Sequence, residues 1–264
     1  MSSDALFHEL GQAGLQLTAL GAAEGAAGNI SVFTRRKPEL PQAFSLQRTL
    51  LLPAPAPALA GGWMVVKAAG RRLRDIAADA CTALVALHIL PGGSEGELYA
   101  AGSLAPSSEL NSHLAVHNDQ VERRGVEFHA VVHAQPFHVT FLSHISRYND
   151  TGVFTRRLFR WEPETILVFP EGVAMLPFEV PGSVALMAAS VQALRTFRLV
   201  VWQKHGVLAR SDAGVVQAAD LVEYIEAAAH YEALNLQAGE PAAGLSEEEL
   251  KKICRKVGVQ QSIY

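Results

Sequence analysis

One histidine-containing strand in the sequence has the residue types and spacing of a metal site. His133 and Gln135 are two residues apart at the end of a β-branched run, so both side chains leave the same face of a strand. Neighbouring ligands on one strand face suit a metal ion, although the amide oxygen of a glutamine is a weak, neutral ligand. Taken alone, His133 is more typical of a buried histidine bonded to the backbone.

Further candidate residues stand at a strand end and on a helix. His205 precedes Gly206, and a glycine there fits both a ligand site and a plain turn. Glu109 is predicted in the first turn of a helix, whose positive end favours an ionised carboxylate, either for chemistry or as a simple dipole partner. His113 and His117 follow on the same helical face. That face suggests a metal, but we expect both histidines to pack against the flank of the helix.

Three short polar loops could bind an anionic group. They contain Gly28-Asn29, Gly70 and Ser107-Ser108, and two of them lie close to predicted helix or strand ends. Backbone N–H groups and hydroxyls at a helix N-terminus form a natural phosphate site. None of the three loops is specific by itself.

A mixed α/β domain is expected to position these residues. The predicted helices cover 4–22, the segment that opens at 107–109, 137–147, 183–197, 213–238 and 246–257. The predicted strands cover 28–32, 63–66, 83–87, 128–133, 166–169 and 199–202. Proline-rich residues 38–62 are predicted to be a surface loop and not a domain boundary, so residues 1–264 form one domain.

Composition excludes several classes of protein. The 264 residues are 49% hydrophobic and 18% charged, which predicts a sizeable core. A net charge of −4 without a basic patch argues against nucleic acid. Cys81 and Cys254 form no metal-like or redox-like pair, which indicates a reducing compartment. With no leader-like segment and no apolar run near the roughly 20 residues of a membrane span, we expect a cytoplasmic protein without membrane contact.

The order of these motifs resembles the class II aldolase/adducin family, most closely its rhamnulose-1-phosphate aldolase branch. The matching segments are GNIS at 28–31, PSSEL at 106–110, VVHAQ at 131–135, NDTGVFTRRL at 149–158, ILVFPEGVAMLPFEVPG at 166–182 and VVWQKHGVLARS at 200–211. The resemblance implies a single α/β domain with a central, mainly antiparallel sheet flanked by helices. It also implies a homotetramer with active sites between neighbouring subunits.

The resemblance implies a metal-dependent aldehyde-lyase. Such an enzyme cleaves a ketose, especially a ketose-1-phosphate, to a dihydroxyacetone-type product and an aldehyde. His133, Gln135 and His205 would hold a divalent metal, usually zinc, that polarises the ketose oxygens. Glu109 would be the acid/base and Glu164 a second active-site acid.

The substrate, a small sugar or sugar phosphate, would be bound by the polar loops. By position, the residues that match phosphate or substrate-binding positions of the family are Asn29, Gly70, Ser107 and Ser108. The segment Lys67–Gly70 stands where the family has a hydroxyl-rich phosphate loop. Lys67 could supply charge instead, or the substrate could lack a phosphate.

Gln135 is the main departure from the family pattern, because it replaces the second histidine of the strand pair. Loss of a residue that only hydrogen-bonds to a metal ligand already weakens metal binding roughly 10–100-fold. Because Gln135 stands at a ligand position itself, we expect weaker zinc binding and a shift toward harder metals. Two alternatives to a lyase follow: an epimerase that uses the same site, or a non-enzymatic, adducin-like relative. Retention of Glu109, His133, Glu164 and His205 favours an enzyme.

Overall fold

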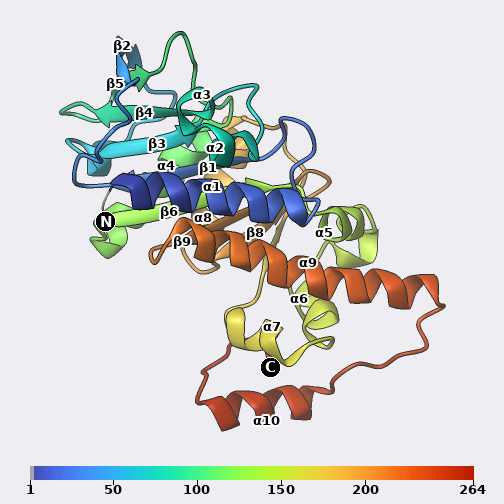
Figure 1. Ribbon diagram of the computed structural model, residues 1–264. Helices are drawn as coiled ribbons and strands as arrows, with labels where there is room; N and C mark the ends of the chain where they lie inside the picture. The colour runs from blue at the N-terminus through green and yellow to red at the C-terminus, as the bar shows by residue number, and fades with distance from the viewer. Residues whose placement is uncertain (1–2) are drawn as a thin grey trace.

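Nine strands form one sheet in the computed structural model, which describes residues 3–264 (Figure 1). The strands are β1 Asn29–Thr34, β2 Ser45–Leu51, β3 Trp63–Lys67, β4 Leu84–Ile89, β5 Glu95–Ala100, β6 Phe128–Ala134, β7 Ala174–Leu176, β8 Leu199–Trp202 and β9 Gly206–Ser211. They lie in the order β2-β5-β4-β3-β1-β6-β9-β8-β7. All neighbours pair antiparallel except β7 and β8. This single α/β domain with a mainly antiparallel sheet confirms the predicted fold class.

Helices cover both faces of the sheet. They are α1 Ser3–Ala19, α2 Asp75–Ala78, α3 Ala80–Ala83, α4 Leu110–Arg124, α5 Phe137–Leu142, α6 Thr151–Phe159, α7 Pro163–Val168, α8 Val184–Leu194, α9 Val215–Gln237 and α10 Glu247–Val257, with short 3-10 turns at Pro57–Leu59 and Ser146–Tyr148. Helices α1 and α9 pack together on one face, and α4 packs with α8 on the other (Figure 1). Between residues 3 and 264, no helix has both the length and the apolar character to cross a membrane.

Alternation along the central strands distributes their side chains between the two helical layers. Val65 of β3 packs in the same cluster as the apolar residues of α1 and α9, whereas Met64 and Val66 pack with those of α4. Because both faces are covered, the central strands are buried along almost their whole length. The middle of the sheet is therefore a rigid base, and the residues at its strand ends are held in fixed positions.

Three predicted elements differ from the structure. Residues 166–169, predicted as a strand, fall largely in α7, because Pro163 starts a helix and a short apolar run does not distinguish a strand from a buried helix. The predicted loop at 38–62 contains the edge strand β2, which pairs with β5. The helix predicted over 137–147 ends at Leu142. By contrast, the predicted capping box of Ser246 and Glu249 is present at the start of α10.

Candidate metal centre

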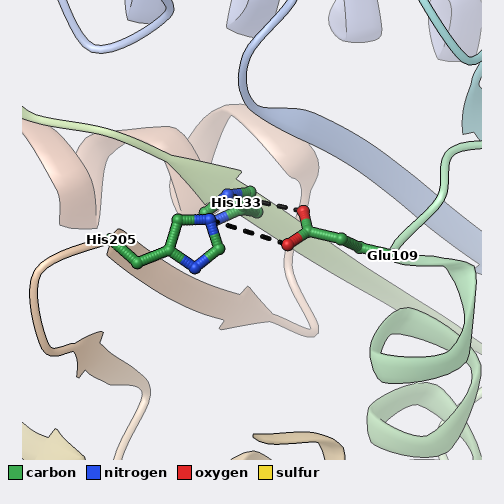
Figure 2. A group of neighbouring side chains, drawn as sticks. All are labelled: Glu109, His133 and His205. Carbon is green, nitrogen blue, oxygen red and sulfur yellow. Dashed lines mark ion pairs between the residues drawn. The ribbon is translucent and has the colours of Figure 1, made fainter. Parts of the chain in front are cut away.

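Three chain segments meet at one end of the central sheet. His133 is the last residue but one of β6, and His205 lies in the turn between β8 and β9. Strand β9 pairs with β6, with Leu208 opposite His133, so the turn that contains His205 lies beside the end of β6. Glu109 is at the N-terminus of α4 and faces both rings (Figure 2). The structure thus brings together Glu109, His133 and His205, three of the four residues that were expected to converge, the fourth being Gln135.

The ligand atoms of these three residues have the spacing of a coordination site. Glu109 Oε2 is 3.5 Å from His133 Nε2, and Glu109 Oε1 is 3.7 Å from His205 Nε2. One candidate ligand atom from each residue can be chosen so that all lie within 4.8 Å of one another. Atoms bound to a tetrahedral Zn²⁺ at about 2.0–2.2 Å are about 3.4 Å apart, so the observed separations fit a shared ion. One carboxylate oxygen and two imidazole nitrogens are a donor set that suits a divalent ion.

The backbone fixes the orientation of His133. Its Nδ1–H donates to the carbonyl of Val207 on β9 at 2.8 Å, and the ring is 1% exposed. A neutral imidazole that donates from Nδ1 has its lone pair on Nε2. That lone pair lies on the side of Glu109. A ligand histidine held by its other nitrogen in this way is typical of protein metal sites.

A close backbone approach positions His205. A Cβ at Gly206 would lie 2.3 Å from the carbonyl oxygen of Ala134, so only glycine allows the turn to pass so near the end of β6. Burial, followed by the neighbouring His133, lowers the pKa of His205 to about 4. The ring is therefore neutral at physiological pH and has a lone pair for a ligand. Its Nδ1 and Glu109 Oε1 are buried without hydrogen-bond partners.

Glu109 is ionised in spite of its burial. Burial alone would raise the pKa of this carboxyl group, but His133, the hydrogen bond from Asn29, and His205 together lower it below the usual value. Asn29 Nδ2 donates to Glu109 Oε2 at 2.7 Å. The helix begins at Leu110, so Glu109 occupies the N-cap position and not the first turn, where it was predicted. Its side chain does not cap the helix but turns toward the histidines.

Gln135 borders the same side of the centre. It lines a pocket of about 400 Å³ together with His205, Phe137, Lys204 and other residues. Its backbone N–H donates to the carbonyl of Ala22 at 2.8 Å, which fixes the chain just beyond β6. The position is compatible with the predicted role as a third ligand, and that role stays a prediction.

The predicted substrate loops are adjacent to each other. Ala68 and Pro106 form a β-bridge, and the N–H of Ser107 donates to the carbonyl of Lys67 at 3.1 Å. Ser108 and Gly70 are exposed on these joined loops, and Ser107 is buried. The structure thus places Ser107, Ser108 and Gly70 beside the N-terminus of α4. Their contact with a substrate stays a prediction.

Lys67 is buried behind these loops. Its Nζ donates to the carbonyls of Ala26 at 2.8 Å and Arg71 at 2.5 Å, and burial lowers its pKa to about 8. The side chain therefore joins the segment before β1 to the segment after β3. It organises the two loops, a function that the sequence did not reveal.

Glu164 lies apart from the centre. It lines a different pocket, of about 410 Å³, with Glu162, Asp220, Glu223 and Tyr224. Within one chain the structure does not bring Glu164 together with Glu109. Its predicted role as a second active-site acid stays a prediction.

Sequence reasoning missed the direct bond from Asn29 to Glu109, because Asn29 was assigned only to the substrate. Asn29 pairs with His133 across β1 and β6, so strand register delivers it to the centre. In the sequence, the only feature that could have indicated this bond is the place of Asn29 at the start of a β-branched run after Gly28. His113 and His117 are fully buried on α4, as expected for residues that pack against the flank of the helix.

Known proteins resemble the chain over most of its length. A family model described as "Class II Aldolase and Adducin N-terminal domain" matches residues 8–233. The rhamnulose-1-phosphate aldolase of Bacteroides thetaiotaomicron is 30% identical over 241 residues, which cover 88% of this chain and 87% of that protein. The structure of a sugar-phosphate aldolase from Thermotoga maritima has a TM-score of 0.75 and 28% identity, covering 90% of this chain and 97% of that one. An L-fuculose 1-phosphate aldolase shares the fold, with a TM-score of 0.62 at 24% identity over 98% of both chains.

Proposed function

The chain belongs to the class II aldolase and adducin family, and we propose that it is a metal-dependent aldolase that cleaves a ketose-1-phosphate. The products would be a dihydroxyacetone-type phosphate and an aldehyde. Relatives named for rhamnulose 1-phosphate and fuculose 1-phosphate support this substrate class. The reverse reaction, aldol addition, would use the same groups.

The observation that supports this proposal most strongly is the placement of the Glu109 carboxylate against the Nε2 atoms of two histidines. The carboxylate is 3.5 Å from His133 Nε2 and 3.7 Å from His205 Nε2, too far for hydrogen bonds and suitable for a shared cation. Glu109 Oε1 and His205 Nδ1 are buried without hydrogen-bond partners, and a scaffold without catalytic function would gain no stability from such atoms. This favours the enzyme over the adducin-like alternative.

Each residue of the centre has a task in the proposed reaction. His133, His205 and Glu109, with Gln135 completing the set, would hold a divalent cation, for which zinc is the first candidate. When bound, such an ion acts as a Lewis acid on a carbonyl or hydroxyl oxygen. Glu109 takes the proton of the substrate hydroxyl and returns a proton to carbon. The bond from Asn29 fixes its carboxylate for that transfer.

The phosphate end of the substrate would lie on the joined loops. Gly70 and Ser108 are exposed there, and the N-terminus of α4 supplies a positive electrostatic potential. Lys67 stabilises both the loop that precedes β1 and the loop that follows β3 through two carbonyl contacts. The adjacency of the loops supports a phosphorylated substrate in spite of their missing hydroxyls.

Glu164 can take part in the reaction only from another copy of the chain. It lines a separate acidic pocket in the protomer that contains Glu109. A homotetramer with sites at subunit boundaries would allow Glu164 of one subunit to reach the centre of its neighbour. Measurement of molar mass in solution by light scattering checks this arrangement, which a monomer would contradict.

Metal analysis followed by a cleavage assay tests the proposal. The purified protein is expected to bind about one divalent ion per chain and to release dihydroxyacetone phosphate from rhamnulose 1-phosphate or fuculose 1-phosphate. His205→Ala should lose both the metal and the activity, since a neutral ligand is removed. His8→Ala, which removes an exposed histidine on α1, is the matched control and should retain both. Wild-type protein with no bound metal and no cleavage of either ketose would contradict the proposal.

A further inference from the structure

Trp202, the last residue of β8, packs against both histidines of the metal centre and has no task in the reaction described above. The centroid of its ring lies 4.6 Å from that of His133 and 5.1 Å from that of His205. Its plane is stacked on that of His205 at 27° and tilted from that of His133 by 35°. The side chain is 1% exposed. A buried ring in contact with two candidate ligands is placed to control how they are oriented.

Helix α8 fixes the indole in this position. Trp202 Nε1–H donates to Ser190 Oγ at 2.8 Å, and the Ser190 hydroxyl donates to the carbonyl of Leu186 at 2.7 Å. Ser190 is fully buried. Rotation of the indole would leave its N–H buried without an acceptor, which is unfavourable. The indole therefore offers the two histidines a surface with one orientation.

The two histidines differ in what else orients their rings. His133 donates from Nδ1 to the carbonyl of Val207. His205 Nδ1, by contrast, is buried and has no hydrogen-bond partner among residues 3–264. Histidines that bind a metal almost always use their second ring nitrogen in a hydrogen bond that fixes the ring. Because His205 lacks that bond, its orientation depends on the surfaces against which the ring packs.

The surfaces that hold the His205 ring are aromatic. One is the indole of Trp202, and the other is the ring of His133, 4.8 Å away at 62°. The backbone N–H of His205 donates to the carbonyl of Trp202 at 3.0 Å, so the turn itself keeps the two residues together. Offset stacking of two aromatic rings restricts their relative orientation. In the stacked orientation His205 Nε2 lies 3.7 Å from Glu109 Oε1.

Stacking on an indole also favours the metal-bound form of a histidine. An imidazole that shares its lone pair with a divalent ion becomes electron-poor. The face of an indole carries a negative electrostatic potential and attracts positive groups, most strongly where water is excluded. Trp202 thus interacts more favourably with His205 when an ion is bound. An aliphatic side chain in its place would fill the space without this effect.

We propose that Trp202 is a positioning residue of the metal centre. Its indole, held by Ser190, orients His205 for a divalent ion and replaces the hydrogen bond that His205 Nδ1 lacks. This inference rests on the proposed function in one respect, namely that the centre binds an ion. It gives α8, which supplies no ligand, a part in the affinity of the centre.

Metal affinity, measured on the full chain by competition with a metal-binding dye, tests the proposal. Trp202→Leu should bind Zn²⁺ about tenfold more weakly, the lower end of the roughly 10–100-fold effect of losing a residue that supports a ligand. Trp202→Phe keeps a flat ring at the same place and should retain most of the affinity. Wild-type affinity in Trp202→Leu, or equal losses in the two variants, would overturn the proposal.

Trp63→Leu is the matched control. Trp63 is also a buried indole stacked on a histidine, His88, at 4.7 Å and 18°. It lies far from the centre, because it pairs with Thr34 at one end of β1, whereas His133 pairs with Asn29 at the other end. This variant should lose stability but keep its metal affinity. Equal losses of affinity in the two leucine variants would assign the effect to general destabilisation and overturn the proposal.

Ser190→Ala tests the link to α8, because it removes the acceptor of the indole N–H and leaves both rings in place. It should weaken metal binding in the wild-type background and have no further effect in Trp202→Leu protein, since substitutions that act through one contact are not additive. Equal effects of Ser190→Ala in both backgrounds would overturn the link between Ser190 and the centre.

Carbon-13 relaxation of the His205 ring, measured by NMR in metal-free protein, separates this inference from the proposed function. The ring should be rigid on the nanosecond timescale in the wild type and in Trp202→Phe, and mobile in Trp202→Leu. An equally rigid ring in Trp202→Leu would overturn the positioning role. Wild-type protein that binds no divalent ion would instead contradict the proposed function, and the mobility of the ring would still decide whether Trp202 orients His205.

Discussion

The metal centre and a second group of buried side chains both contain histidines, and they differ in how the ring nitrogens are used. The second group, which we call the histidine row, consists of His113, His117, Ser31 and His129, joined by hydrogen bonds. At the centre, His133 and His205 have Nε2 atoms directed at Glu109 without a hydrogen bond. In the row, His117 has both nitrogens bonded to other side chains. Burial lowers histidine pKa values in both places. The comparison shows that burial alone does not identify a metal-binding histidine. A ring nitrogen that has no hydrogen bond and is directed at a carboxylate does identify one.

The largest effect is expected at the acid of the centre. Glu109→Gln should lower the cleavage rate by about 10²–10⁴-fold, because a positioned acid/base contributes that much, while the fold is retained. The assay measures ketose-phosphate cleavage beside the melting temperature. Glu122→Gln, an exposed carboxylate on the same helix, is the control and should be unaffected. A Glu109→Gln protein with near-normal turnover would remove Glu109 from the mechanism.

A substitution in the row should act mainly on stability. His117→Ala leaves a cavity and removes partners from Ser31 and His129, so the free energy of unfolding should fall by about 2–4 kcal/mol. Urea denaturation measures this, and metal content measured on the folded fraction should stay near the wild-type value. Loss of metal at unchanged stability would show that the row belongs to the centre, and that the distinction drawn above is wrong.

The row should also make the protein sensitive to acid. The pKa of His129 in the folded state is about 3, below the roughly 6.5 of an unfolded chain, so only the unfolded state gains a proton between these values. Its stabilising contribution is complete above pH 6.5 and is lost as the pH falls toward 3, by about 1.4 kcal/mol per pH unit for each such histidine. Urea denaturation at several pH values between about 7.5 and about 4.5 measures how the free energy of unfolding changes with pH. A flat profile would contradict a neutral row.

The smallest effect is expected at Gln135. Gln135→His should strengthen metal binding by about tenfold or more, since imidazole is a better zinc ligand than an amide oxygen. Gln135 borders the pocket that His205 lines, so the strand end needs no rearrangement. Competition with a metal-binding dye measures the affinity. An unchanged affinity would show that Gln135 faces away from the centre, which would then consist of Glu109, His133 and His205 alone.

Local patterns were sufficient for much of the fold. The β-branched run at 128–133, the capping box at Ser246 and the helix over 213–238 were read correctly, because propensity and packing agree there. Residues 166–169 were read wrongly, since four apolar residues fit a strand and a buried helix equally well. Strand β2 was missed because its exposed edge residues lack the pattern of a buried strand.

The sequence by itself determined the residue types of the centre: it identified Glu109, His133 and His205 as candidates and Gln135 as the departure from the family pattern. Only the tertiary structure decided which nitrogens are open, because that depends on the bond from His133 to Val207 and on the approach of Gly206 to Ala134. Hydrogen bonds between strands and helices distant in sequence leave no periodic signal. For the same reason the hydrogen bonds of the histidine row could not be foreseen, since its members come from β1, α4 and β6 and meet only after the sheet has formed.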